Sequence, residues 1–514
     1  MVEQQPKKIV IIGAGPAGLT AAYQLRKTKT DFVVLERDAV VGGLSRTVNY
    51  KGYHFDIGGH RFFTKVEPVA EMWREVLGAE DFLERPRLSR IYYDNKYFHY
   101  PLQATNALFG LGIWNSVLIF LSYLRAKLFP VKPETTFEDW VTNRFGRRLY
   151  NTFFKTYTEK VWGIPCDEIS ADWAASRIKG LSLIAAIKNA LMQTAKGDGG
   201  KIKTLITEFH YPRRGPGQMW EAVANVVNEE GTIPERLRMG VGVERILWSD
   251  AGVKAVEVNT PDGRERVAGT DFISTMPVRE LIAKLSPPAP AEVQRAAASL
   301  KYRDFLTVAL IVNKRELFPD NWIYIHDPRV RLGRIQNFKN WSPEMVPDDS
   351  TTCLGLEYFC FEGDELWTKS DDELITLAKR ELALLGLVKE SDVTDGSIVR
   401  MPKAYPVYDA TYLEALSVVR EFLARLTNLQ LIGRNGMHKY NNQDHSMLTA
   451  MLAVENIHGA QHDLWQVNAD DEYHEESAAS DAGQAAEMNR LLASTQPRVP
   501  RRHDALPVAI EPKR

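Results

Sequence analysis

The chain has 514 residues, more than one hydrophobic core ordinarily supports, so we expect two or three domains. Its 64 Lys and Arg nearly balance its 66 Asp and Glu, which removes a general electrostatic case for nucleic-acid binding. The three cysteines, Cys166, Cys353 and Cys360, show no C-x-x-C spacing for a metal or a redox pair. Because the first apolar segment follows directly after MVEQQPKK, with no room for a secretory signal, we expect a cytoplasmic protein.

The first predicted element is a buried strand that opens into a helix, in IVIIGAGPAGL from Ile9 to Leu19. Gly13 permits a tight turn, Gly15 lets the backbone approach a pyrophosphate, and Gly18 lets the helix pack on the strand. The next apolar run, FVVLER, places Glu36 at a strand end, where a carboxylate binds a ribose 2′-hydroxyl and disfavours a 2′-phosphate. These spacings predict a dinucleotide site.

The segment at 108–124, LFGLGIWNSVLIFLSYL, is the most apolar stretch of the chain. It is shorter than the ~20 residues of a spanning helix and contains Asn115 and Ser116. We therefore predict no transmembrane span and expect a buried helix, with an interfacial anchor as the alternative.

The remaining chain changes character in blocks. Helical spacing in FEDWVTNRFG and LSLIAAIKNALM gives way to strands in VKAVEVNTPDGRERV and TDFISTMPV, with a hairpin turn at PDG. LQLIGRNG is a further buried strand followed by a helix. This layout is typical of large flavoproteins and predicts an α/β fold, in which a Rossmann-like FAD-binding domain is interrupted by a helical domain and a mixed-sheet substrate domain. The predicted parts are an FAD-binding domain (1–98, 205–290 and 425–465), a helical substrate domain (99–204), a sheet-bearing substrate domain (291–424) and a mobile tail (466–514).

Several segments resemble a known family. GGLSRT and FDIGGHRFF are similar to flavin-contacting segments of amine oxidases and, more specifically, of UDP-galactopyranose mutases. GRNGMHKYNNQDHS resembles the flavin- and substrate-facing turn of the eukaryotic-type mutases, and YFHYPLQ, EKVWGIP, FHYPRRGPGQMW and NFKNWSP follow in the order of that family. The resemblance covers most of residues 8–460.

The resemblance implies a set of site residues, and their chemistry suits a nucleotide sugar. A diphosphate favours Arg over Lys because the guanidinium binds it in a bidentate manner, and a uracil needs an aromatic face. Without such a context, an arginine is more often a solvated surface charge and a strand aromatic more often part of the core. The implied catalytic residues are His60, Arg177 and Arg334. The implied substrate-binding residues are Phe63, Tyr100, Gln103, Trp162, Trp322, Tyr324, Tyr405, Tyr440 and Asn442. The implied cofactor-binding residues are Gly13, Gly15, Ala17, Gly18, Glu36, Gly43, Leu44, Arg46, Gly59, His60, Val243, Gly433, Arg434, Gln443 and Ser446.

The expected activity is therefore the interconversion of pyranose and furanose forms of a UDP-hexose on reduced FAD, without net redox change and with NADPH or NADH as a candidate reductant. No metal-ligand motif, nucleophile elbow or phosphate loop competes with this interpretation. Thr158 stands where the family commonly has Asn, His438 replaces a Trp, and the turn between Tyr440 and Asn442 is shorter, so the sugar stays open. An oxidoreductase of the amine-oxidase or desaturase type and a non-enzymatic flavoprotein scaffold are the alternatives. The oligomeric state also stays open, with a homo-oligomer as one candidate.

Overall fold

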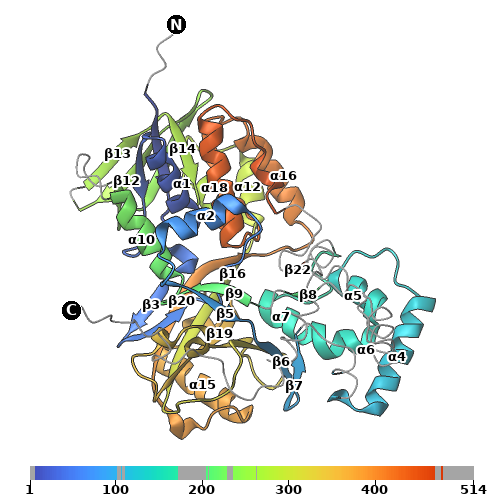
Figure 1. The fold of residues 1–514 in the computed structure, drawn as a ribbon. Coiled ribbons are helices and arrows are strands. Elements are labelled where there is room, and N and C mark those ends of the chain that lie inside the picture. Colours follow the sequence, from blue (N-terminus) through green and yellow to red (C-terminus); the bar gives the residue numbers. More distant parts are fainter. Residues whose placement is uncertain are drawn as a thin grey trace, which may run out of the picture.

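The computed structural model describes residues 6–100, 106, 110–171, 204–205, 208–228, 236–261, 263–468 and 476–477 (Figure 1). Two predicted site residues, Gln103 and Arg177, lie outside the described residues, as does most of the predicted tail.

A five-stranded parallel sheet forms the upper part of the molecule in Figure 1. Its order is β10 (Leu237–Arg238), β2 (Asp31–Leu35), β1 (Lys8–Ile12), β14 (Asp271–Ser274) and β21 (Leu429–Leu431). The helices that cover it include α1 (Pro16–Lys27), α2 (Glu67–Val76), α10 (Gly217–Asn228), α17 (Gly433–Gly436) and α18 (Gln443–Ile457). All its pairings are parallel, so the carboxyl ends of the strands meet at one edge. The prediction that TDFISTMPV and LQLIGRNG return to the nucleotide-binding sheet is confirmed.

A smaller four-stranded sheet packs beside the first. It contains β13 (Gly263–Ala268), β12 (Gly252–Thr260), β11 (Val243–Ser249) and β15 (Leu285–Ser286), and the neighbouring helices are α11 (Val278–Ala283), α12 (Ala291–Ser299) and α16 (Tyr412–Leu423). The predicted hairpin is confirmed, because Thr260 pairs with Gly263 across the turn.

A seven-stranded mixed sheet forms the lower part of the molecule (Figure 1). Its order is β20 (Val393–Pro406), β16 (Tyr302–Val312), β19 (Thr352–Cys360), β18 (Arg334–Asn337), β17 (Trp322–Ile325), β6 (Ser89–Tyr93) and β7 (Lys96–His99). The associated helices are α13 (Phe338–Trp341), α14 (Glu365–Thr368) and α15 (Asp371–Leu384). β6 and β7 thus join this sheet, although the sequence assigns residues before 98 to the nucleotide-binding part.

Short two-stranded pairings connect these parts. They are β3 (Thr47–Tyr50) with β4 (Tyr53–Asp56), β5 (Phe82–Pro86) with β9 (Glu208–Pro212), and β8 (Thr204–Leu205) with β22 (Glu476–Ser477).

The helical part lies at the lower right of Figure 1. It consists of α4 (Ile113–Leu128), α5 (Phe137–Phe145), α6 (Arg147–Leu149), a π-helical turn (Tyr150–Lys155) and α7 (Thr156–Trp162). The apolar segment at 108–124 is helical from Ile113, but the expectation that this helix is buried is wrong, because Trp114 is 74% exposed and Leu121 is 53% exposed. Within the described residues no helix has the length and apolar character needed to cross a bilayer.

Candidate functional site

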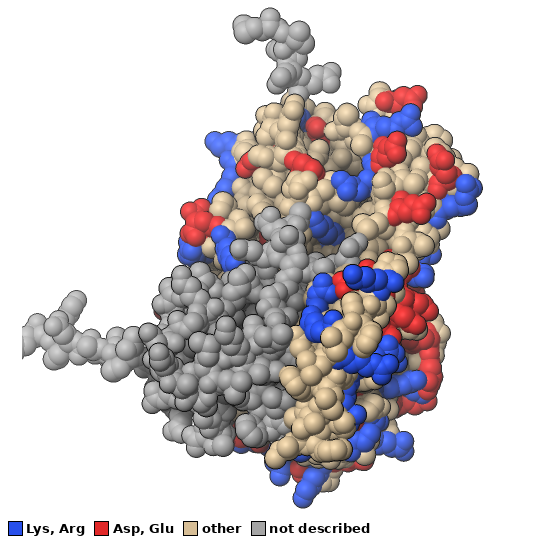
Figure 2. Space-filling model, turned by 90° about the vertical axis from the view of Figure 1, so that its right-hand side faces the viewer, with Lys and Arg blue, Asp and Glu red and all other residues tan. Residues whose placement is uncertain are grey.

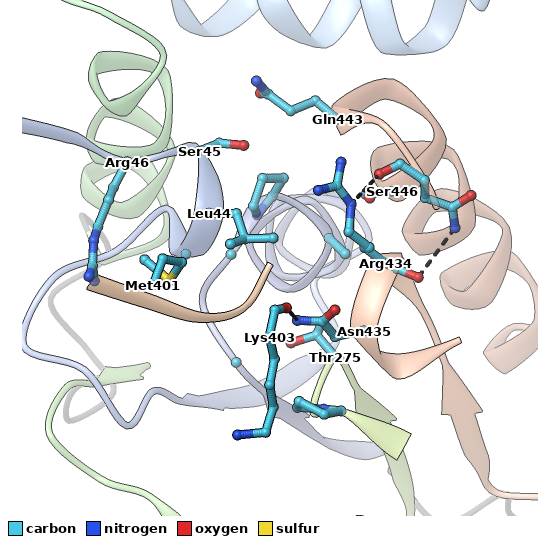
Figure 3. A pocket seen from close by; sticks show the side chains of 18 of the residues that line it. Leu44, Ser45, Arg46, Thr275, Met401, Lys403, Arg434, Asn435, Gln443 and Ser446 are labelled. Atoms are coloured by element: carbon cyan, nitrogen blue, oxygen red, sulfur yellow. Dashed lines mark hydrogen bonds between the residues drawn. The ribbon is translucent and has the colours of Figure 1, made fainter. Parts of the chain in front are cut away.

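A cavity of about 600 Å³ lies between the parallel sheet and the seven-stranded sheet. Figure 3 shows how its walls come from distant segments: Leu44, Ser45 and Arg46 from the N-terminal part, Met401 and Lys403 from β20, and Arg434, Gln443 and Ser446 from the C-terminal part. Its volume falls in the range of cofactor and small-molecule sites.

Most of the predicted site residues line this cavity. They are Gly13, Gly15, Ala17, Glu36, Gly43, Leu44, Arg46, Gly59, His60, Phe63, Val243, Tyr324, Arg334, Tyr405, Gly433, Arg434, Tyr440, Asn442, Gln443 and Ser446.

Four further predicted residues lie behind the lining. Gly18 packs on the turn at Gly13. Tyr100 and Trp322 back Tyr324, with ring centroids 4.6 Å and 6.4 Å from it. The Trp162 ring is 6.5 Å from that of Tyr405 and 6.4 Å from that of Tyr440.

At the turn between β1 and α1, Gly13 and Gly18 have no space for a side chain. Gly13 has φ +100°, and a Cβ built on it would lie 2.1 Å from Oγ1 of Thr275. A Cβ on Gly18 would lie 1.9 Å from the carbonyl oxygen of Gly13. Gly15 faces Gly43, whose Cα is 3.8 Å from the position of an added Cβ. Two glycine backbones therefore border the space where the α1 N-terminus can hold an anion.

Glu36 lies at the end of β2, where the sequence predicts the ribose contact. Its Oε2 accepts a hydrogen bond from the Ala14 N–H at 2.6 Å, and its Oε1 accepts one from the Asp38 N–H at 2.8 Å. Burial raises the pKa of Glu36, while these two N–H groups oppose the rise. The carboxylate is thus fixed in orientation and each oxygen keeps acceptor capacity for a hydroxyl.

Arg46 was expected beside the flavin, and the structure ties it to the same end of the cavity as Glu36. Its Nη1 donates to Oδ2 of Asp38 at 2.8 Å. The guanidinium is thereby held at Asp38, two residues after Glu36, the candidate for ribose binding.

Gln443, the first residue of α18, supplies a direct test of whether the cavity suits FAD. Both its amide atoms, Oε1 and Nε2, are buried without a hydrogen-bond partner among the described residues. A buried amide left in this state costs free energy, which a polar ligand would recover. Together with the glycine turn and Glu36, this amide fits a flavin dinucleotide, and these residues would hold it.

The wall formed by β18 and β19 contains an ion pair. Register places Arg334 opposite Glu357, whose carboxylate is fully buried. Arg334 donates from Nε to Glu357 Oε2, while Gln336 donates to Glu357 Oε1 at 2.7 Å. Burial acts to lower the pKa of Arg334, but Glu357 and the nearby tyrosines outweigh it and the pKa is raised well above its ordinary value. Arg334 is a permanent cation in the cavity wall.

Arg434 is a second guanidinium in the cavity wall and is held by two hydrogen bonds to backbone carbonyls. Its Nε donates to the carbonyl of Asn441 at 2.9 Å, and its Nη1 donates to the carbonyl of Ala404 at 3.0 Å. Its guanidinium carbon lies 5.3 Å from the Tyr405 ring and 4.7 Å from the Tyr440 ring, which stack on each other at 12°. The second cation is therefore preorganised against an aromatic wall.

His60 follows the Gly58–Gly59 turn and is a neutral group. Burial, reinforced by Arg434 and Arg334, lowers its pKa to about 3. Its Nδ1 has no hydrogen-bond partner among the described residues. A Cβ on Gly59 would lie 2.9 Å from Nε2 of Gln336, so only glycine allows this loop to approach the ion-paired wall.

Sequence reasoning missed Glu357 and Gln336, which orient Arg334, and Lys403, whose carbonyl accepts from Asn435 Nδ2 at 2.9 Å. No local motif marks Glu357, because its partner is set by strand register. Among the described residues no cluster of His, Cys, Asp and Glu could hold a metal ion.

Comparisons with known proteins agree with this geometry. The family described as flavin containing amine oxidoreductase matches residues 16–408. The L-amino acid oxidase Cdc18 of Crotalus durissus cumanensis is 42% identical over 74 residues, 14% of this chain and 15% of that protein. This chain therefore spans less than a sixth of that relative's length. The coproporphyrinogen III oxidase of Mycobacterium leprae is 24% identical and covers 80% of this chain and 90% of its own.

Among solved structures, that of a reduced UDP-galactopyranose mutase has a TM-score of 0.76 at 23% identity, over 90% of this chain and 98% of that one. A likeness at this identity shows the fold, which is the predicted α/β flavoprotein fold. With a family match over most of its length, a glycine turn for a pyrophosphate and a buried amide facing the cavity, the chain belongs to the flavin containing amine oxidoreductase family.

Proposed function

We propose that this flavoprotein is a nucleotide-sugar mutase of the eukaryotic UDP-galactopyranose mutase type, which interconverts pyranose and furanose forms of a UDP-hexose. The observation that carries the proposal is Arg334, a permanently charged guanidinium in the cavity wall among Tyr324, Tyr405 and Tyr440. Its Nε is used by Glu357, and no described side chain forms a hydrogen bond with its two terminal nitrogens. A guanidinium with two free N–H groups suits a diphosphate oxygen pair.

Charge supports an anionic substrate over an amine. Arg61, Arg334 and Arg434 all line the cavity, and Arg334 and Arg434 border the tyrosine wall. A protonated amine would be repelled by such a wall, whereas two phosphates would be attracted. Arg334 would bind the leaving diphosphate and stabilise charge that develops on it, while the tyrosine hydroxyls donate to neutral oxygens. His60, being neutral, adds no further positive charge.

When bound, reduced FAD supplies an electron-rich ring, and the proposed isomerisation has no net redox change. A cytoplasmic location, a homo-oligomeric state and NADPH or NADH as reductant stay predictions from the sequence.

Turnover with defined substrates tests the proposal. The purified FAD-loaded protein is incubated with UDP-galactopyranose under anaerobic conditions, with the flavin either oxidised or reduced by dithionite. We expect furanose formation with reduced flavin alone, and no stoichiometric consumption of reductant. Oxygen uptake with a porphyrinogen or an amine, together with no binding of UDP-sugars, would instead assign an oxidase, the activity named for the Mycobacterium leprae relative.

Arginine variants sharpen the test. Arg334→Ala and Arg177→Ala should keep FAD but lower turnover by at least about tenfold, since a hydrogen bond to a charged group contributes roughly 1.5–3 kcal/mol. Lys should restore part of the activity because it supplies charge without the planar fork. The matched control is Arg331→Ala, because Arg331 is 51% exposed and pairs with Glu365 at 2.9 Å outside the cavity. Equal turnover in Arg334→Ala and Arg331→Ala would remove the basis of the proposal.

A further inference from the structure

One helix carries most of the exposed apolar surface. Of the twelve large hydrophobic side chains that are exposed in the described residues, nine lie between Ile113 and Val131. Seven of them form one stripe along α4 with helical spacing, which we name the α4 face: Ile113, Trp114, Val117, Phe120, Leu121, Leu124 and Leu128. Contiguous exposed apolar surface of this kind marks a contact site in a folded protein.

The opposite side of α4 fixes the orientation of this face. Ile119, Tyr123 and Ala126 are buried, and the helix packs against α5 and α6. A Cβ on Gly146 would lie 2.7 Å from the backbone nitrogen of Tyr123, so the start of α6 lies directly on the helix backbone. The α4 face therefore cannot turn inward without breaking this contact.

The charges of the segment that carries the α4 face have a single sign, and Glu134 and Glu138, which follow it, are paired with Arg144 and Arg147. The sequence from Lys96 to Pro133 contains no Asp or Glu but has four Lys and Arg: Lys96, Arg125, Lys127 and Lys132. Arg125, Lys127 and Lys132 are exposed and form no ion pair with another described residue. Arg148 adds a cation at the other end, where its Nη2 donates to Asn115 Oδ1 at 2.7 Å. Figure 2 shows this side of the molecule: an uncharged strip in its lower half has Lys and Arg side chains beside it, and Asp and Glu side chains lie along the right-hand edge.

We propose that the α4 face docks the protein on an anionic lipid surface, with α4 lying in the plane of the interface. Apolar side chains including a Trp would enter the boundary between headgroups and acyl chains, and the bordering cations would meet lipid phosphates. A second copy of this chain is the less suitable partner, because a two-fold contact through this face would bring unpaired cations against one another. The helix is too short to span the bilayer, which agrees with a position on its surface.

Vesicle co-sedimentation of the full-length, FAD-loaded protein tests this assignment. We expect binding to vesicles of phosphatidylcholine with phosphatidylglycerol, weaker binding to pure phosphatidylcholine, and a decrease as salt is raised. The double variant Trp114→Gln/Leu121→Gln should lower the partition coefficient at least about tenfold, given the apolar area removed. Leu413→Gln is the matched control, because Leu413 is equally exposed at 53% but lies on α16, and it should bind like the parent protein.

A charge variant separates the two components of binding. Arg125→Gln/Lys127→Gln should weaken the preference for anionic vesicles with only a small change in the thermal midpoint of unfolding. Both side chains are exposed and form no ion pair with a described residue, although the Lys127 Nζ lies 5.5 Å from the centre of the Tyr123 ring. The proposal is overturned if anionic vesicles bind no better than neutral ones, or if Trp114→Gln/Leu121→Gln binds like Leu413→Gln. It is also overturned if light scattering shows a dimer that the same double variant dissociates, because the α4 face would then be a self-interface.

Discussion

The two ends of the cavity achieve binding by opposite means. At the glycine end the backbone lies close to the ligand space because three residues have no side chain: Gly13, Gly15 and Gly43. At the arginine end, Arg334 and Glu357 are charged groups that depend on each other in a buried place. We therefore expect FAD binding to be lost when a side chain is added at the glycine end. At the arginine end we expect the protein to lose stability when a charge is removed.

The largest expected effect is at the glycine end. Gly13→Val would place a β-branched side chain at φ +100° and against Oγ1 of Thr275, so the variant should purify without flavin absorbance. Gly78→Ala is the control, since a Cβ there meets nothing within 4 Å and FAD content should stay unchanged. A yellow Gly13→Val protein with normal FAD content would show that this turn does not contact the cofactor.

The next effect tests the arginine end. Glu357→Gln leaves Arg334 as a mostly buried cation without its counter-charge, which should lower the free energy of unfolding by roughly 3–5 kcal/mol in a urea titration. The exposed carboxylate Glu365 also pairs with an arginine, and Glu365→Gln should cause no measurable loss. If both variants lost the same stability, the buried pair would have no special role.

A smaller expected effect is a loss of FAD affinity at the glycine end. Glu36→Gln keeps the shape of the side chain but removes its charge, so the apoprotein should bind FAD about tenfold more weakly in a fluorescence titration. Glu244→Gln is the comparison, because Glu244 also lines the cavity but pairs with Lys284 at 3.3 Å near its rim. An unchanged dissociation constant for Glu36→Gln would place the ribose elsewhere.

The last effect concerns acid stability, and it depends on His326, a buried imidazole that does not line the cavity. Burial and Lys160 lower the pKa of His326 to about 3 in the folded protein, while its ordinary value is 6.5. Between these pH values the unfolded chain takes up a proton that the folded protein excludes, so stability falls as pH falls, by about 1.4 kcal/mol per pH unit for one histidine. His326→Phe should make the free energy of unfolding less steep between pH 6 and pH 4. An identical slope in both proteins would contradict the lowered pKa.

The same contrast explains what the sequence could predict. The glycine end is local, since its turn and Glu36 fall within one strand–helix–strand unit, and spacing alone indicates their roles. The arginine end is assembled by strand register, which brings Glu357 opposite Arg334 with no motif to announce it. The resemblance identified Arg334 as a site residue but could not indicate that its Nε is already occupied.

Helix α4 shows a second limit of prediction from sequence. Its composition predicted a helix, but apolar residues lie on both sides of it, so periodicity could not say which side packs inward. That choice is made by α5 and by Gly146, which meet the helix from elsewhere in the chain.

The order of the parallel sheet has a consequence for biogenesis. Ile9 pairs with Asp271, and β21, which flanks β14, is made after most of the chain has been synthesised. Strands that are distant in sequence pair slowly, because the entropy cost of closing the loop between them comes before the stabilising contacts form. During translation β1 can pair with β2 at once, but its other edge stays open until β14 has been synthesised, and β14 in turn stays open until β21 follows. A chain stopped before Leu429 would lack both the edge of the sheet and Gln443, so nascent protein should require chaperone protection until its last fifth emerges.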